Sequence, residues 1–275
     1  MSDAVIADLT IPQAVDLFLT PARRGEATYP EVFEQATLLR VPYRQRVFLR
    51  PEGEAVEVQA YAWGPAQAPG VLLVHGWESH AGRMGGFVEP LLRQGYRVLA
   101  FDAPAHGRSG GRQASMADFA GAIEALSSRF APVVGLIGHS LGGGAALWHL
   151  AHTPAAPLRK VVALGAPARI ADPLRGFARA LGLSREATAE LFAAFEQRFG
   201  QPVEFFGIDR LRFPPEVEVL LVHDREDDVI PYAHAEALQG GIPAARLQST
   251  TGLGHRAILK EESVIAQVAR FLGGP

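Results

Sequence analysis

Short apolar runs alternate with amphipathic stretches along most of this chain. From Gly70 onward the apolar runs are rich in β-branched residues and lack polar alternation, which is typical of strands buried on both faces of a parallel sheet. Between them, apolar residues such as Met116, Phe119 and Ile123 recur at helical spacing. This rhythm predicts β-α-β units and therefore an α/β fold with a mostly parallel, doubly wound sheet. The predicted strands are Val71–Val74, Tyr96–Ala100, Val133–Ile137, Lys160–Leu164 and Val217–Val222.

The N-terminal part of the chain follows a different pattern. Residues 56–63 alternate between apolar and polar side chains, which is typical of a half-buried strand. A second strand over Arg46–Arg50, joined to the first through Pro51 and Gly53, completes a predicted antiparallel hairpin at the edge of the sheet. Residues 1–45 are expected to form an arm that leads into the sheet. The apolar positions of a short helix within this arm are Val15, Phe18 and Leu19.

One interval, from about residue 166 to residue 211, breaks the alternation of strand and helix. Asp172 favours the start of a helix and Gly182 its end, while Ser184 favours the start of a second helix. No linker, repeat or low-complexity tract separates this interval from the rest. We therefore expect a small helical cap within a single α/β domain over residues 1–275. The apolar positions are Leu174, Phe177, Ala178 and Leu181 in the first helix and Leu191, Phe192, Phe195 and Phe199 in the second.

Composition excludes several classes of function. The chain of 275 residues is 48% hydrophobic and carries 26 Lys and Arg against 29 Asp and Glu, for a formal net charge of −3. Without a basic excess, binding to nucleic acid or to an anionic membrane surface is not expected. The chain has no cysteine, which rules out disulfides, thiolate metal sites and a cysteine nucleophile and is compatible with a reducing compartment.

Targeting signals and membrane spans are not predicted either. The first twenty residues hold three aspartates and no basic residue, unlike a secretory signal. The longest apolar runs have the length of a strand and are far shorter than a membrane-spanning helix. We therefore expect a cytoplasmic protein without a membrane span. The sequence does not specify an oligomeric state.

The sharpest chemical signal is the pentapeptide Gly138-His139-Ser140-Leu141-Gly142, which matches G-x-S-x-G. It follows a predicted buried strand and precedes a helix of small residues, which is the context of a nucleophile elbow. On such a turn the serine has strained backbone angles and projects its hydroxyl above the sheet, beside the positive end of the helix. Gly138 and Gly142 are needed because a Cβ at either position would collide with neighbouring backbone. The alternative interpretation is a serine that only caps a helix after a glycine-rich crossover.

A serine hydroxyl needs a base, and the base needs an acid to orient it. Both types of residue occur downstream of Ser140, in the order Ser, Asp, His. Asp224, Asp227 and Asp228 follow the last predicted strand, and His255 precedes the last predicted helix. Because the carboxyl ends of parallel strands meet at one edge of the sheet, we expect these loops to lie together. The sequence therefore predicts a Ser-His-Asp triad with three candidate acids.

Five short motifs occur in order along the chain: His75-Gly76-Trp77, FDAPAHGRS at Phe101–Ser109, GHSLGG at Gly138–Gly143, DDVIP at Asp227–Pro231 and GLGH at Gly252–His255. With them the chain, from about Val47 to its C-terminus, resembles the α/β-hydrolase superfamily, in particular serine esterases and lipases with a short helical cap. The resemblance implies the α/β-hydrolase fold, with Ser140 as nucleophile, Asp227 as acid and His255 as base. It implies no cofactor and no metal.

One position departs from the pattern of that family. Where the family usually has glycine after the residue that corresponds to His223, this chain has Asp224. An aspartate tolerates left-handed backbone better than most residues, so the turn can still form. It also places a third carboxylate in the loop, and Asp228 and then Asp224 remain alternatives to Asp227 as the acid.

The alkoxide of a tetrahedral intermediate needs two preorganised N–H donors, each typically worth ~3–4 kcal/mol. The backbone N–H of Leu141, directly after the nucleophile, is one expected donor. His75-Gly76-Trp77 resembles the HG-x turn of the family, so the backbone N–H of Trp77 is the second. The ring of Trp77 is expected to face the acyl pocket, with packing on the cap as the alternative.

Other polar residues near these motifs are expected to support the site without taking part in the chemistry. The predicted roles are packing and loop hydrogen bonds for the buried positions and solvent exposure on a helix for the H-x-x-H pair. No phosphate loop, dinucleotide fingerprint or calcium loop occurs, so no cofactor or metal is implied. These residues are His75 and His139 beside the site, Asp102 and His106 in the Phe101–Ser109 turn, and His149 and His152 on the helix after Ser140.

These features favour a serine hydrolase that cleaves carboxylic esters through an acyl-enzyme. A thioesterase, an aminopeptidase, an acyltransferase or a perhydrolase could use the same triad, and a non-catalytic ligand-binding protein of the same fold is a further alternative. The expected partner is a small-molecule ester, with an apolar acyl group if the apolar residues of the cap line the pocket rather than only seal the cap onto the core. Those residues are Phe177, Leu181, Leu191, Phe192, Phe195, Phe199, Phe205 and Phe206.

Overall fold

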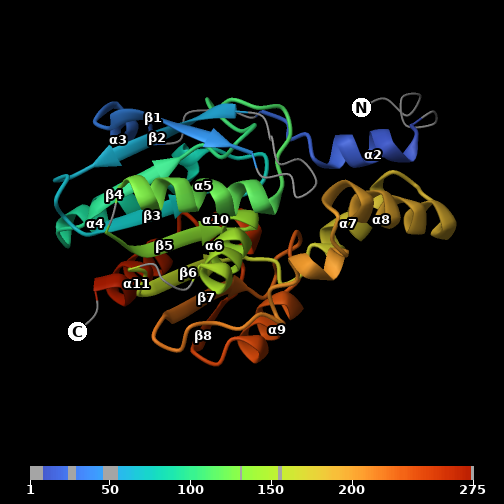
Figure 1. Cartoon of the computed structure of the whole chain (residues 1–275). Coiled ribbons are helices and arrows are strands. Elements are labelled where there is room, and N and C mark those ends of the chain that lie inside the picture. The colour runs from blue at the N-terminus through green and yellow to red at the C-terminus, as the bar shows by residue number, and fades with distance from the viewer. Residues whose placement is uncertain (1–8, 24–28, 46–54, 131, 154–156, 274–275) are drawn as a thin grey trace.

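The computed structural model describes residues 9–23, 29–45, 55–130, 132–153 and 157–273. Within these residues one mixed sheet of eight strands has the order β1-β2-β4-β3-β5-β6-β7-β8 (Figure 1). The strands from β3 to β8 run parallel, whereas β2 is antiparallel to both β1 and β4. They are β1 (Thr37–Arg44), β2 (Ala55–Trp63), β3 (Gly70–Val74), β4 (Arg97–Phe101), β5 (Val133–His139), β6 (Lys160–Leu164), β7 (Glu218–Asp224) and β8 (Ala245–Thr250).

All five predicted parallel strands are present, which confirms the predicted α/β fold. β4 lies one residue further along the chain than predicted, and β7 continues to Asp224. The apolar pattern does not identify β8, whose residues are only half-buried or exposed. β8 is an edge strand paired with β7 alone, so it needs fewer apolar residues than the central strands.

The N-terminal hairpin is present, but its first strand differs from the prediction. β1 pairs antiparallel with β2, so part of the expected arm over residues 1–45 is a strand. The predicted strand Arg46–Arg50 lies outside the described residues. Val41 and Tyr43 are buried while their neighbours in β1 are exposed, which is a period-two pattern. Pro42 lies between them, and an edge strand accepts a proline because one side of its backbone has no partner.

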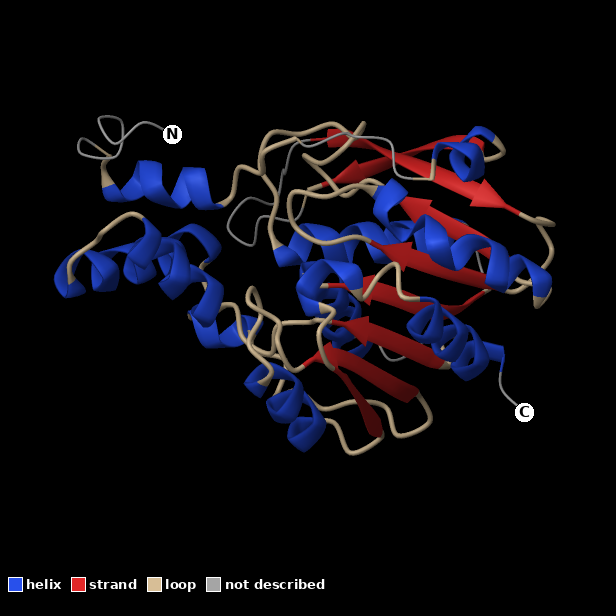
Figure 2. Cartoon of the chain, turned by 180° about the vertical axis from the view of Figure 1, so that it is seen from behind, coloured by secondary structure: helices blue, strands red, loops and turns tan. Residues whose placement is uncertain are grey.

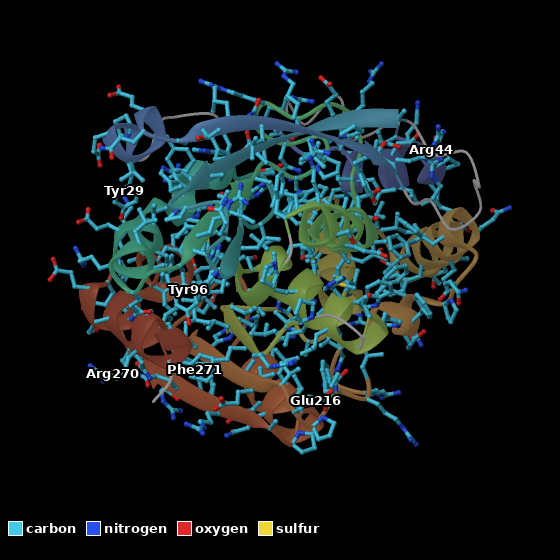
Figure 3. All side chains as sticks on the ribbon, turned by 60° about the vertical axis from the view of Figure 1, so that its left-hand side comes forward. Tyr29, Arg44, Tyr96, Glu216, Arg270 and Phe271 are labelled. Carbon is cyan, nitrogen blue, oxygen red and sulfur yellow. The ribbon has the colours of Figure 1, made fainter. Side chains whose placement is uncertain are left out.

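Both faces of the sheet are covered, so the central strands are buried on both sides. Leu72 and Val74 of β3 point into one apolar cluster, and Val71 and Leu73 into the other. On the second face the Tyr96 hydroxyl donates to the carbonyl of Leu272 at 2.7 Å, beside the C-terminal helix (Figure 3). The first cluster includes α5 (Met116–Arg129), α6 (Leu141–His152) and α9 (Ala233–Gly241), and the second includes η1 (Ala81–Phe87), α4 (Val88–Arg93) and α11 (Glu262–Gly273).

The helices expected between residues 166 and 211 are present between β6 and β7. They are α7 (Ala171–Ala180), α8 (Arg185–Phe199) and the short 3₁₀ helix η2 (Val203–Phe206). Ser184 caps α8 as predicted, because its hydroxyl accepts the N–H of Ala187 at 3.2 Å. The predicted cap of α7 is wrong. The helix already begins at Ala171, and the carboxylate of Asp172 lies inside its first turn, where it pairs with Arg175 at 2.7 Å.

The N-terminal helix α2 (Ile11–Phe18) lies beside α8, although more than 160 residues separate them in the chain (Figures 1 and 2). The ring of Phe18 lies 5.3 Å from that of Phe177 and 6.1 Å from that of Phe195, between centroids. Ala14 and Val15 of α2 belong to the same apolar cluster as the buried residues of α8. The cap is therefore built from two distant parts of the chain.

Two further helices among the described residues are short: α3 (Pro30–Glu34) and α10 (Gly254–Ala257). None of the helices in the described ranges has both the length and the apolar character that crossing a bilayer requires. The expected cytoplasmic location stays a prediction.

Candidate active site

Ser140 lies on the turn between β5 and α6, where the sequence predicts it. Its φ of 52° and ψ of −125° fall in a region that residues with a side chain rarely adopt. Its backbone N–H donates to the carbonyl of Leu164 on the neighbouring strand at 2.8 Å. A Cβ added at Gly138 would lie 2.5 Å from the carbonyl oxygen of Gly142, and one added at Gly142 would overlap the carbonyl oxygen of His75. The close packing around the turn therefore requires both glycines and holds the serine in its strained conformation.

His255 and Asp227 are joined by a hydrogen bond of 2.7 Å between Nδ1 and Oδ2, and both side chains are buried. The second carboxylate oxygen, Oδ1, accepts the backbone N–H groups of Val229 at 2.9 Å and Ile230 at 2.8 Å. Burial alone would raise the pKa of Asp227, but the hydrogen bonds from His255 and Ile230 outweigh it and lower the pKa. An ionised carboxylate can only accept, so Nδ1 of His255 carries the proton and donates it.

The other two candidate acids, Asp224 and Asp228, make no hydrogen bond to His255 among the contacts of the described residues. Asp224 is fully buried, and its Oδ2 accepts the Thr250 hydroxyl at 2.7 Å and the N–H of Leu253 at 3.1 Å. Burial would raise the pKa of Asp224, but these bonds and others from backbone N–H groups lower it. Asp224 therefore braces the loop that leads to His255. Asp228 is exposed and lines a groove beside α7.

Ser140 and His255 line the same cavity, which has a volume of about 600 Å³. Asp227 lies behind the imidazole, on the side away from the free ring nitrogen. Among the contacts of the described residues there is no hydrogen bond between the Ser140 hydroxyl and the His255 ring. Such bonds are often long before a substrate binds. The structure thus brings the predicted nucleophile and base to one cavity, with the predicted acid on the base.

The two expected N–H donors belong to residues near Ser140: Leu141 follows it in the chain, and Trp77 lines the same cavity. Leu141 is the first residue of α6, so its N–H belongs to the helix end that has no intrahelical acceptor. Trp77 follows Gly76, where an added Cβ would come within 2.9 Å of the Ser140 Cβ. His75 fixes this turn: its Nδ1 bonds the Gly76 carbonyl at 2.7 Å, and its Nε2 accepts the N–H of Ala103 at 2.9 Å. The indole of Trp77 lines the cavity next to Ser140.

His139, the residue before Ser140, holds the backbone of His255. Its Nε2 lies 2.8 Å from the backbone carbonyl of His255, and the two rings are 4.7 Å apart between centroids. Burial, followed by the nearby His255, lowers the pKa of His139 to about 3. The ring is therefore neutral at ordinary pH, and Nε2–H donates to the carbonyl. Sequence reasoning expects loop hydrogen bonds from His139, but no local signal identifies the loop of His255 as the partner.

The other polar residues singled out from the sequence hold loops or pack. Asp102 accepts the N–H of Ala81 at 2.8 Å and so ties its turn to the start of η1. His152 is exposed on α6 as expected and stacks on Trp148 at 3.9 Å. His149 is buried, contrary to the expectation, because α6 packs against both the sheet and α5. Across the described parts of the chain, no three His, Cys, Asp or Glu side chains are placed to hold a metal ion.

A second cavity, of about 220 Å³, also reaches Ser140 and lies under the cap. Of the eight apolar cap residues named from the sequence, only Phe195, Phe199 and Phe206 line it. Phe192 instead packs against Arg175, whose Cζ lies 5.5 Å above the centroid of the Phe192 ring. None of the described residues that line this cavity is charged. The cavity is also lined by residues that the sequence pattern does not assign to a pocket: Phe18 and Leu19 of the N-terminal segment, Met116, Ile170 and Val229.

Two family models match successive parts of the chain. Residues 66–198 match the family described as serine aminopeptidase, S33, and residues 208–275 match the family described as TAP-like protein. A serine hydrolase-like protein from Danio rerio is 36% identical over 99 residues, which are 33% of this chain and 29% of that protein. A bifunctional esterase/perhydrolase from Acinetobacter calcoaceticus is 33% identical over 119 residues, which are 41% of this chain and 42% of that protein. The chain thus spans less than half the length of these two relatives.

The fold is also shared with solved structures. An esterase from Pyrococcus furiosus matches 92% of this chain and 96% of its own with a TM-score of 0.63, at 20% sequence identity. At that identity the match shows the fold alone. The strand order, the elbow at Ser140, the two family models and this structural match agree, and the chain belongs to the α/β-hydrolase superfamily.

Proposed function

We propose that this protein is a serine hydrolase that cleaves carboxylic esters through an acyl-enzyme. Nε2 of His255 takes the proton of the Ser140 hydroxyl as Oγ attacks the ester carbonyl carbon, and the N–H groups of Trp77 and Leu141 stabilise the alkoxide. His255 then gives this proton to the oxygen of the departing alcohol, which leaves the acyl group on Ser140. Water attacks the acyl-enzyme by the same route, and the carboxylic acid departs.

The observation that carries the proposal is the 2.7 Å hydrogen bond between His255 and Asp227, at the cavity that Ser140 lines. The carboxylate keeps the proton on Nδ1, so Nε2 is the basic nitrogen, and it stabilises the imidazolium that forms during attack. One relative and one structural neighbour are named esterases, which favours an ester as the substrate class.

The two cavities at Ser140 accept different parts of the ester. His255 lines the larger cavity but not the apolar one. Since His255 must reach the departing oxygen, the alcohol portion lies in the larger cavity. The acyl portion then lies in the apolar cavity, beside Leu141 and under the rings of Phe195 and Phe199. An apolar acyl chain of medium length is therefore favoured over a polar acid.

The apolar cavity also argues against an aminopeptidase, although the matching family description names one. The acyl portion of an aminopeptidase substrate carries a free ammonium group, and a buried ammonium needs a carboxylate partner. The described residues that line the apolar cavity offer no carboxylate. We expect turnover of an octanoyl p-nitrophenyl ester to exceed that of an amino-acid p-nitroanilide. Faster turnover of the anilide would replace the ester proposal with a peptidase.

Perhydrolysis is a second candidate, because one relative is named an esterase/perhydrolase. Hydrogen peroxide would then replace water in the attack on the acyl-enzyme, and a peracid and free Ser140 would form without any change of oxidation state. The measurement is peracid formation from an ester and hydrogen peroxide, in the wild type and in Ser140→Ala. Peracid that forms equally in both would exclude the acyl-enzyme route.

Labelling with a fluorophosphonate tests the nucleophile directly, since this reagent modifies activated serines. The wild type is expected to react, and Ser140→Ala is not. Ser79 lines the same cavity, and no hydrogen bond among the described residues joins its hydroxyl to a histidine, so Ser79→Ala is the matched control and is expected to keep the label. Labelling that persists in Ser140→Ala, with mass spectrometry placing it elsewhere, would overturn the proposed nucleophile.

A further inference from the structure

The larger cavity at Ser140 carries more cationic than anionic side chains. Arg83 comes from η1, Arg256 from α10 directly after His255, and Lys260 from the turn that follows α10. Glu78 is the single carboxylate among the described lining residues. The chain as a whole has a formal charge of −3. The cations at this cavity are therefore a local feature and not part of a generally basic surface.

These cations are available to a ligand. Among the described residues, no ion pair neutralises any of the three. Arg83 is half-buried, which limits its rotamers, while Arg256 and Lys260 are exposed and can extend toward a bound molecule. Glu78 already accepts the N–H of Ala22 at 3.2 Å, so its charge is partly satisfied.

The charge of Asp227 does not cancel these cations in the cavity. Its two oxygens are taken up by Nδ1 of His255 and by the N–H groups of Val229 and Ile230, behind the imidazole. The positive charge of Arg256, in turn, acts in the same direction as burial and His255 in lowering the pKa of His139. The field of the guanidinium thus reaches His139, beside the site.

We propose that the larger cavity selects esters whose departing alcohol carries an anionic group, a carboxylate or a phosphate, a few bonds beyond the scissile oxygen. The inference rests on the proposed ester hydrolysis and defines its substrate class. It follows from two placements: His255 locates the alcohol portion in this cavity, and Arg83, Arg256 and Lys260 line the same space. Guanidinium and ammonium groups bind both carboxylate and phosphate oxygens through charge-assisted hydrogen bonds.

A set of four phenyl butanoates tests the proposal with one acyl chain and one type of leaving atom. They carry hydroxymethyl, carboxymethyl, phosphonomethyl or aminomethyl at the meta position, so the methylene group keeps the acidity of the leaving phenol similar. We expect kcat/KM for the two anionic esters to exceed that for the neutral ester by about tenfold at low salt, and that for the cationic ester to be the lowest. A larger gain for the phosphonate than for the carboxylate identifies a phosphate as the natural group, and the reverse order identifies a carboxylate.

Ionic strength and substitutions test whether the three cations cause the preference for anionic esters. Raising the ionic strength from ~0.02 M to ~0.5 M should reduce the anionic preference several-fold, because the charges are partly exposed to solvent. The triple variant Arg83→Gln, Arg256→Gln, Lys260→Gln should bring the ratio of anionic to neutral turnover close to one. Arg270→Gln is the matched control: Arg270 is an exposed arginine of α11 on the side of the molecule away from the cap (Figure 3), and this variant should keep the ratio.

The outcomes separate this inference from the proposed function. Hydrolysis of all four esters at equal kcat/KM, or an anionic preference that survives the triple variant, overturns the inference and leaves ester hydrolysis standing. Preference for the aminomethyl ester overturns it as well. If none of the four esters is hydrolysed and no acyl-enzyme forms on Ser140, the proposed function fails and the inference fails with it.

Discussion

The loops at the carboxyl edge of the sheet and the cap above them are held by different kinds of contact. At the sheet edge, backbone groups lie so close together that Gly142 cannot carry a Cβ, and the loop of Asp227 is fixed by backbone N–H groups on its carboxylate. In the cap, the rings of Phe18, Phe177 and Phe195 join α2, α7 and α8 through contacts of 5.3–6.1 Å. The backbone contacts at the sheet edge allow only one geometry, whereas the side-chain contacts in the cap can be repacked.

Under the proposed function, this difference assigns the bond-making steps to the sheet edge and the choice of substrate to the cap. The reaction requires atoms placed to within a fraction of an ångström, which the crowded backbone of the sheet edge provides. An acyl pocket requires only apolar volume, which the exchangeable side chains of the cap provide. Substitutions at the sheet edge should therefore stop the reaction or unfold the turn, while comparable substitutions in the cap should change selectivity.

The largest expected effect is at Asp227, the proposed acid. Asp227→Asn keeps the size of the side chain but removes the charge that holds the proton on Nδ1 of His255, so kcat should fall on the order of 10⁴-fold. The measurement is steady-state turnover of an octanoyl p-nitrophenyl ester. Asp228→Asn, one residue further along the same loop and exposed, should change kcat by less than about twofold. Equal damage from the two substitutions would contradict the assignment of the acid.

One glycine from each region provides the next comparison. In Gly142→Ala the new methyl group overlaps the carbonyl oxygen of His75, so the free energy of unfolding should fall by about 3 kcal/mol. In Gly176→Ala, within α7 of the cap, the nearest atom is the end of the Arg179 side chain at 3.9 Å, so helix propensity should raise the free energy of unfolding by about 0.5–1 kcal/mol. Urea titrations measure both changes. Equal tolerance of alanine at the two positions would contradict the contrast between the regions.

A smaller effect is expected on substrate choice in the cap. Phe195→Leu enlarges the apolar cavity, so the ratio of kcat/KM for decanoyl over butanoyl esters should rise by about tenfold, if two further methylene groups are buried. Phe192→Leu is the control, because Phe192 contacts Arg175 and does not line the cavity. A rise of the same size in Phe192→Leu would show that general loosening of the cap, and not the cavity wall, sets the chain length.

The smallest effect concerns acid stability at the sheet edge. The folded state lowers the pKa of both Asp224 and Asp227 below the ordinary value of 3.8, so the unfolded chain binds more protons in that range. Stability from these groups is therefore present above pH 3.8 and is lost as the pH falls through their lower folded values. Asp224→Asn should flatten this dependence of the free energy of unfolding between about pH 2 and 5. An unchanged slope would show that the bonds to Thr250 and Leu253 do not depend on the charge.

The local pattern of the sequence predicts much of the sheet and part of the site. A strand in the middle of a parallel sheet is buried on both faces, so it needs an unbroken apolar run such as Val71–Val74 wherever it occurs in the chain. The elbow at Ser140 is visible for a similar reason, because its conformation demands glycine at fixed positions on either side. An edge strand needs fewer apolar residues, and the apolar pattern therefore does not predict β1 or β8.

The local sequence pattern does not decide which aspartate is the proposed acid. The end of β7 and the loop after it offer Asp224, Asp227 and Asp228, all compatible with the same sequence pattern. The structure distinguishes them by their partners. Asp224 accepts from Thr250, Asp227 accepts from His255, and Asp228 is exposed to solvent. The resemblance to a family points to Asp227, and the hydrogen bond of 2.7 Å supplies the physical reason.

The sequence by itself determined the central parallel strands, the two helices of the cap, the turn that strains Ser140, and the presence of a histidine and carboxylates at the same edge of the sheet. Only the tertiary structure decided that α2 packs beside α8, that Phe18 lines the apolar cavity while Phe192 does not, that His139 holds the carbonyl of His255, and that Arg83 joins Arg256 at one cavity. The physical reason is that periodicity reveals which face of an element is apolar but not which element covers it. Contacts between residues far apart in the chain depend on packing that no local pattern records.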